Sequence, residues 1–350
     1  MDSVTHLFYG GAIAAAIAPP QHRRAALLAG MALNTLPDLD VLPLMFSDDP
    51  VLRMTWHRSA THSWLVLPFI AWALWAFFRS RGGRVAAEPR RWWWAIFACL
   101  MAHPLLDSFT VYGTQLLWPL PMRPLMWSSL FIVDPLFTLP WLLAFLVAWF
   151  ARERRFGQYA LVAGITLGTA YVGWSLAAKR QVELVADASL ASAGLDAAPR
   201  FSVPMPLSPW RWKVVAMTRD GYVEGERSLS DAGPMEFASH RSDVQALSSA
   251  AAIPSVQRLA WFNHGFMRAD VRDGELQLAD LRMGDEPDYP FRFAVAVRQP
   301  GGWHAITPVD VERENSRKAL RELWKRLRDP QAAQATAQAS GTTPAASASK

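Results

Sequence analysis

Histidine and aspartate residues recur at the ends of long apolar stretches in the first half of this 350-residue chain. The two densest groups are His57-Arg58-Ser59-Ala60-Thr61-His62-Ser63 and His103-Pro104-Leu105-Leu106-Asp107. Ionisable side chains are costly at membrane depth, so those beside apolar segments usually face a cavity or a partner. Imidazole nitrogens and carboxylate oxygens together form a common ligand set for divalent metal ions. These residue types therefore predict a metal site.

The spacing of His103 and Asp107 carries the most structural information. Residues four apart share one face of a helix, so one helix can offer both side chains to the same ion. Pro104 between them removes a backbone donor and would kink or begin a helix, and broken helices at membrane depth often line a site. The alternative is a histidine at a helix end with Asp107 as an ordinary cap.

His57 and His62 are five apart, which does not place them on one face of a regular helix. We expect His57 in an incoming loop and His62 near the start of the next helix, with Thr61 or Ser63 as its cap. Arg58 would bind an anionic substrate group or balance the acids. The alternative is that both histidines are ordinary polar residues at the membrane interface.

Three further acidic or basic positions join this set. Asp38 and Asp40, after Pro37, form an Asp-X-Asp pair at the end of an apolar segment, which suits oxygen ligation of a cation. His6 is a weak candidate by itself and is included because of its expected position. Asp134, followed by Pro135, is interpreted as a helix N-cap and not as a catalytic residue.

Composition divides the chain into two parts. Hydrophobic residues make up 51% and charged residues 19%, but the first half is rich in Trp, Leu, Phe and Ala with few acids. The net charge of +5 is modest, and the arginines cluster beside apolar runs, which favours membrane orientation over nucleic-acid binding. Cys99 is the single cysteine, so an intrachain disulfide and an all-cysteine zinc site are excluded. We expect Cys99 to be a small buried hydrophobe.

Six apolar segments are expected in the membrane half. The first two are short for a crossing and are expected to form a helical hairpin with small-residue packing faces. Arginines crowd the connections on one side, which marks the cytoplasmic face. Counting crossings from those clusters puts all seven candidates, His6, Asp38, Asp40, His57, His62, His103 and Asp107, on the external face. The segments are 5–18, 25–36, 63–78, 92–106, 131–150 and 157–178.

The ordered set of motifs resembles a known group. Thr5-His6, Leu36-Pro37-Asp38-Leu39-Asp40, the His57 and His103 motifs, Tyr112-Gly113-Thr114, Trp118-Pro119 and Phe131-Ile132-Val133-Asp134-Pro135 occur in sequence. Residues 1–178 resemble the bacterial inner-membrane metal-dependent hydrolase family, whose members are described as LexA-binding. The resemblance implies a multi-pass inner-membrane protein with a His/Asp metal site and hydrolase activity. The His-X-X-X-Asp element is also similar to one in zinc-dependent phospholipases C, which implies phosphoester chemistry.

The second half reads differently. Residues 179–200 are interpreted as a linker or a helix continuation, and residues 201–330 as a small β-rich, soluble domain on the external, periplasmic side. Strand-like alternation covers 210–227 and 259–296, with turns at Asp220-Gly221, Asp273-Gly274 and Gly284. A helix is expected over 309–328 and a disordered tail over 331–350. The predicted fold is therefore mainly α, a polytopic helical bundle followed by an α+β domain.

The favoured function is a membrane-bound hydrolase that uses a metal-activated water on a lipid or phosphoester substrate. The predicted ligands are His6, Asp38, His57, His62, His103 and Asp107, holding one or two ions of Zn, Mn or Fe. Asp40, as general base or as support for a ligand, and Arg58 are the predicted catalytic residues. Membrane lipid is the expected partner, and nucleic acid is not. The alternatives are a non-catalytic scaffold or regulator with a structural metal, and an ion-coupled transporter; sites at one face argue against the transporter.

Overall fold

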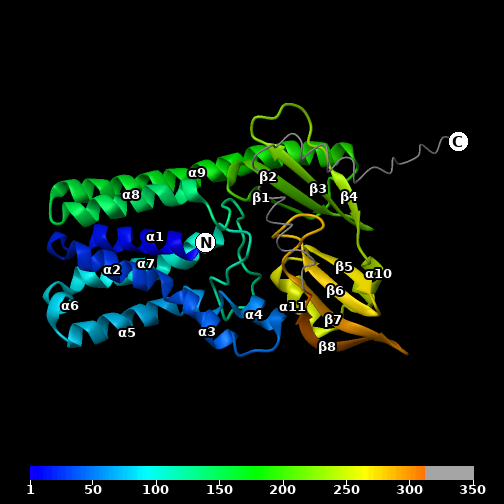
Figure 1. The fold of residues 1–350 in the computed structure, drawn as a ribbon, viewed down its shortest axis with the longest axis horizontal. Coiled ribbons are helices and arrows are strands. Elements are labelled where there is room, and N and C mark those ends of the chain that lie inside the picture. The colour runs from blue at the N-terminus through cyan, green and yellow to red at the C-terminus, as the bar shows by residue number, and fades with distance from the viewer. Residues whose placement is uncertain (312–350) are drawn as a thin grey trace.

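The computed structural model describes residues 1–311, as a helical N-terminal part followed by two antiparallel sheets (Figure 1). All six apolar segments form helices. They are α1 (Ser3–Ile17), α2 (Arg23–Thr35), α5 (Leu67–Ser80), α7 (Pro89–Ser108), α8 (Pro135–Ala151) and α9 (Arg155–Ser192). Short helices connect them: η1 (Pro20–His22), η2 (Pro37–Asp40), α3 (Val41–Leu44), α4 (Pro50–Trp56), η3 (Ala60–His62) and α6 (Gly83–Ala87). The predicted tail and nearly all of the helix expected over 309–328 lie outside the described residues.

Two stretches, Pro20–Leu44 and Arg155–Ser192, are long and apolar enough to cross a membrane. A third candidate is the pair Pro50–His62 and Leu67–Ser80, which is bent by 58°. The apolar helices α1 and α8 are shorter, with 15 and 17 residues. The structure therefore supports a helical part with two or three candidate spans among the described residues, and the six-crossing arrangement stays a prediction.

Helices α1 and α2 form the expected hairpin, and glycine allows their close approach. A Cβ added to Gly10 would lie 2.1 Å from Cβ of Asn34 and 2.4 Å from the carbonyl oxygen of Gly30. No other residue type fits at this contact without moving one helix. The backbones therefore touch where α2 carries Asn34, which contacts the candidate site.

The basic turns gather at the end of the helical part that lies away from the sheets (Figure 1). The Arg23 guanidinium donates to the backbone carbonyl oxygens of Arg152 and Arg154, and Arg24 donates to that of Trp149. The α1–α2 turn and the α8–α9 turn are therefore neighbours. The C-terminal end of α2, which leads into η2 with Asp38, and the C-terminal end of α7, which carries Asp107, lie at the opposite end, beside the sheets.

The first sheet has the strand order β1-β2-β3-β4 and the second β5-β6-β7-β8, all antiparallel. Their strands are β1 (Arg200–Met205), β2 (Ser208–Met217), β3 (Gly221–Ser228), β4 (Ala238–Arg241), β5 (Met267–Arg272), β6 (Glu275–Asp280), β7 (Arg292–Gln299) and β8 (Gly302–Asp310). The short helices α10 (Val244–Ser249) and α11 (Pro254–Phe262) lie between the two sheets in the sequence. The prediction of a β-rich part with α+β character is confirmed.

One detail differs from the expectation, and one open interpretation is resolved. The strand-like pattern expected from Leu259 is wrong at its start, because Leu259 belongs to the amphipathic helix α11 and its side chain packs into the core. Of the two interpretations of the stretch after residue 178, helix is found, since α9 continues unbroken to Ser192. Ala178, Val182 and Ala186 of this extension pack against Trp212 and Val214 of β2, so burial against the first sheet stabilises it.

Candidate metal centre

The C-terminal half of α7 presents His103 and Asp107 to one buried point. Both side chains have no solvent exposure, and Pro104 lies inside the helix between them. Their atoms His103 Nε2 and Asp107 Oδ2 are 3.4 Å apart. The expectation that an i, i+4 pair shares a face is confirmed here, and the alternative of a simple helix cap at Asp107 is excluded.

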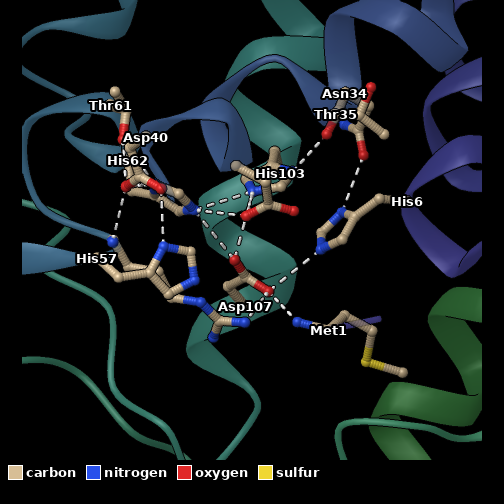
Figure 2. Close-up of polar contacts among 12 residues, drawn as sticks. Met1, His6, Asn34, Thr35, Asp40, His57, Thr61, His62, His103 and Asp107 are labelled. Carbon is tan, nitrogen blue, oxygen red and sulfur yellow. Dashed lines mark hydrogen bonds and ion pairs between the residues drawn. The ribbon is translucent and has the colours of Figure 1, made fainter. Parts of the chain in front are cut away.

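Two short 3₁₀ helices place Asp38 and His62 beside His103 and Asp107. Pro37 begins η2, whose first turn carries Asp38, and η3 ends with the buried residue His62. His62 Nε2 lies 3.0 Å from His103 Nε2, 3.4 Å from Asp38 Oδ1 and 3.3 Å from Asp107 Oδ2. His103 Nε2 lies 3.3 Å from Asp38 Oδ1. Four potential ligand atoms, one from each residue, thus meet within 4.8 Å of one another (Figure 2).

Hydrogen bonds determine which ring nitrogen of each histidine carries the proton. His103 Nδ1 contacts the backbone carbonyl oxygen of Asn34, which can only accept, so Nδ1 donates. Thr61 donates its hydroxyl proton to Asp40 (2.9 Å), and its oxygen therefore accepts from His62 Nδ1 (3.1 Å). Both Nε2 atoms then present lone pairs to each other. Two facing lone pairs need a cation or a shared proton between them.

The two oxygens of the Asp107 carboxylate lie in different environments. Its Oδ1 atom contacts the Met1 amino group, His6 Nε2 (3.2 Å) and Arg58 (3.2 Å). Its Oδ2 atom is buried and has no hydrogen-bond donor among the described residues. A buried carboxylate oxygen without a donor is costly. The free oxygen faces the two Nε2 lone pairs, where a metal ion would satisfy all three atoms.

The separations fit a metal ion of the size of zinc. Zinc binds histidine nitrogen and carboxylate oxygen at about 2.0–2.2 Å, so neighbouring ligand atoms of a tetrahedron are about 3.3–3.6 Å apart. Four of the five measured separations are 3.3–3.4 Å, and the two histidine nitrogens are slightly closer at 3.0 Å. Two nitrogens and two oxygens suit zinc, and also manganese or iron. The residues present therefore fit a divalent ion.

His6 lies beside this group and contacts it through Asp107 Oδ1. Its ring stacks on His103 with centroids 3.9 Å apart, and its Nδ1 donates to the side-chain oxygen of Asn34 (3.0 Å). The Asn34 amide nitrogen donates to the Cys99 carbonyl oxygen (2.6 Å), which determines how the amide is oriented. His6 thus reaches the face of Asp107 that points away from the four convergent atoms. Cys99 is buried, as expected.

His57 is also outside the convergent group. Its Nδ1 contacts Asp40 Oδ1 (2.7 Å), and its ring lies edge-on to His62 at 5.8 Å (Figure 2). Asp40 Oδ2 also accepts from the Arg58 amide (3.0 Å) and the Thr61 hydroxyl. Both Asp40 oxygens are therefore occupied, which favours its role as support for a ligand over that of general base. The expected cap from Thr61 or Ser63 is wrong, since helix α5 has no side-chain cap and Ser63 donates to the Trp118 carbonyl oxygen.

Arg58 fits the second of its two expected roles, balancing an acid. Its side chain is buried, contacts Asp107, donates to the Thr110 hydroxyl (3.1 Å) and stacks on Tyr112 at 4.9 Å. Burial raises the pKa of the Tyr112 phenol above its ordinary value of 10, so Tyr112 stays protonated and donates to the Met54 carbonyl oxygen. The Tyr112 ring also packs on Phe262 of α11, and Arg282 donates to the Tyr112 carbonyl oxygen. The sheet-containing part thus forms one wall of the site.

Sequence reasoning missed the contacts made by Asn34, Thr61, Thr110 and Tyr112. A signal existed for Asn34, because an amide inside an apolar, small-residue helix needs a polar partner. Thr61 and Tyr112 had a signal only in the motifs that carry the family resemblance, and Thr110 has an ordinary loop residue type. Asp134 is confirmed as the N-cap of α8, since its side chain accepts from the Phe137 amide.

Comparison with known proteins gives a family for the helical half. Residues 1–182, more than half of the chain, match the family described as YdjM inner membrane protein. The chain belongs to this family. It is also 34% identical, over 142 residues, to the inner membrane protein YbcI of Escherichia coli (strain K12), covering 39% of this chain and 72% of that protein. No solved structure matches. The match includes all four convergent residues, and it supports an inner-membrane location.

Proposed function

We propose that the protein is a membrane-bound metal-dependent hydrolase whose site opens on the external face. The observation that carries the proposal is the convergence of His62, His103 and Asp107 with the Asp107 Oδ2 atom left without a donor. Buried acceptor atoms that face one another are a costly arrangement unless a cation joins them. Three such atoms in a fully buried setting are therefore best explained by a resident divalent ion.

The partial solvent exposure of Asp38, the fourth residue of the convergent group, supports a catalytic metal ion over a purely structural one. Asp38 keeps 21% of its side chain exposed, whereas His62, His103 and Asp107 have none. Catalytic zinc sites use three protein ligands and keep a position for water, whereas structural sites are closed by four. We therefore assign His62, His103 and Asp107 as the permanent ligands. Asp38 stands at the solvent side, where water and substrate would enter.

The chain supplies the remaining groups for hydrolysis. A divalent ion bound by these residues would polarise the scissile bond and make a water molecule more acidic. His57, oriented through Nδ1 by Asp40, has its Nε2 free of hydrogen bonds within residues 1–311 and can accept or deliver a proton. Arg58 and the Met1 amino group hold Asp107 through its other oxygen and keep its orientation fixed.

The proposed topology is a multi-pass helical bundle with its basic turns in the cytoplasm. Large apolar side chains on the outer faces of α5, α8 and α9 are exposed, among them Phe69, Trp72, Leu143, Phe150 and Leu167. Such surfaces suit contact with lipid. With the arginine-rich turns inside, the metal centre and the sheets lie on the periplasmic side. A substrate at this position would be a lipid or another phosphoester.

A structural metal site in a non-catalytic scaffold is the second candidate, because Asp38 brings the group to four ligand atoms. A hydrolysis assay of the zinc-loaded protein in detergent distinguishes the hydrolase from the scaffold. We would measure release of nitrophenol from bis-nitrophenyl phosphate and of headgroup from phospholipids, with His57→Asn and Asp38→Asn as test variants. Turnover that falls at least tenfold in His57→Asn with metal content unchanged supports the hydrolase. Metal-loaded protein that hydrolyses none of these substrates favours the scaffold.

A further inference from the structure

A cleft of about 460 Å³ lies where the helical part meets the sheet-containing part. One wall is Trp56 at the end of α4, a second is the loop 115–121 with Trp118, and the third is α11 with Arg258 and Trp261. Its volume falls within the range of sites that bind small amphipathic molecules. It is distinct from the metal centre, although Trp56 directly precedes His57.

Arg258 gives this cleft a positive charge that no acid within residues 1–311 neutralises. No lining residue is acidic, and Arg258 forms no ion pair with any described residue. Its guanidinium is held in place by the Thr55 hydroxyl (2.9 Å) and backbone carbonyl oxygen, and it stacks on Trp261 at 4.9 Å. An oriented guanidinium with free donors is suited to a phosphate group.

Apart from Gln115 and Gln257, the rest of the lining is apolar, and it continues to an exposed apolar edge. Leu120, Met122 and Trp56 are 50%, 48% and 41% exposed. Three tryptophans line the cleft, and tryptophan is enriched where a membrane protein meets the headgroup region. A fixed cation beside an apolar edge complements a molecule with a phosphate at one end and acyl chains at the other.

We infer that this cleft binds the phosphate headgroup of an anionic phospholipid, with its acyl chains along the edge formed by Leu120 and Met122. Arg258 contacts the phosphate, and the tryptophan rings pack on the glycerol and upper chain carbons. The inference rests on the inner-membrane location and not on hydrolysis, so metal-free protein binds the lipid equally well. Failure of the hydrolase proposal would therefore leave this inference intact.

The test is native mass spectrometry of the full chain in detergent, titrated with phosphatidylglycerol or phosphatidylcholine. Wild-type protein is expected to bind one phosphatidylglycerol in preference to phosphatidylcholine. Arg258→Gln should weaken that binding roughly tenfold, as expected for the loss of one charge-assisted contact, and Arg258→Lys should keep most of it. Arg241→Gln, an exposed arginine on β4, is the matched charge control and should bind as wild type.

A second variant keeps the test decisive if Arg258→Gln disturbs the fold. Gln257 is exposed at the cleft, and its side chain makes no hydrogen bond to any residue that the structure describes, so Gln257→Glu adds a negative charge without removing a side-chain contact of that kind. It should weaken phosphatidylglycerol binding several-fold, whereas Gln245→Glu on α10 should not. Equal binding of the two lipids, unchanged binding in Arg258→Gln and Gln257→Glu, or displacement of phosphatidylglycerol by millimolar inorganic phosphate would each overturn the inference.

Discussion

Replacing Thr61 by valine tests whether the chain orients its own metal ligand. The substitution keeps the side-chain shape and removes the hydroxyl that links His62 Nδ1 to Asp40. The metal-bound state needs the proton on Nδ1, where it would then lack its partner. The metal-free state can move the proton to Nε2, which blocks coordination. The cost therefore falls on the bound state and appears as lost affinity.

The size of the expected loss in zinc affinity depends on which acceptors remain near the His62 imidazole. Loss of such a supporting contact usually costs 10–100-fold in metal affinity, or about 1.4–2.7 kcal/mol. Asp40 Oδ2 lies 3.8 Å from His62 Nδ1 and can partly replace the hydroxyl. We therefore expect a loss near the lower end, about tenfold.

The assay is competition for zinc between the purified protein and a chelating dye at constant pH. Thr169→Val, at an exposed position of α9, is the matched control and should leave affinity unchanged. If Thr61→Val binds zinc within twofold of the wild type, the hydroxyl does not hold His62 and the assignment of its tautomer is wrong.

Three further predictions concern packing, pH and topology. Gly10→Ala should destabilise the helical part by about 1–3 kcal/mol through overpacking against Asn34, whereas Gly173→Ala, with open space around it, should not; melting temperatures of the two variants in detergent decide this. Burial lowers the pKa of His264 below its ordinary value of 6.5, so protonation costs more free energy in the folded than in the unfolded chain, and stability falls as the pH drops through that value. The melting temperature should therefore fall between pH 7.5 and 5.5, and less steeply in His264→Asn. Reporter fusions at Gly82 and Gly194 should read as cytoplasmic and periplasmic respectively, and a cytoplasmic signal from Gly194 would contradict the proposed side for the sheets.

The sequence predicted the elements of the site better than its internal connections. The spacing of His103 and Asp107 predicted their shared face because helical periodicity is local. The different partners of His57 and His62 could not be predicted, since His57 follows the end of α4 and His62 ends the single 3₁₀ turn η3, where spacing does not determine the direction of a side chain. Arg58, which directly follows His57, adopts a positive φ of 64°, a conformation that the residue type does not predict.

The contribution of the C-terminal part was also beyond the sequence. Tyr112 belongs to one of the motifs behind the family resemblance, but its residue type does not predict that it joins Arg58 to Phe262, 150 positions later in the chain. Such contacts depend on tertiary packing between segments with no shared pattern. The apolar segments, in contrast, were found as helices because their burial and length are properties of each segment alone.

The most direct test of the central claim is the metal content per chain of the detergent-purified protein, beside His62→Ala and Asp107→Ala. We expect bound Zn, Mn or Fe in the wild type and a loss of that metal in both variants, while His22→Ala, at the opposite end of the helical part, retains it. A folded wild-type protein that contains no metal in any preparation, including after incubation with zinc, would contradict the assignment of His62, His103 and Asp107 as a metal centre.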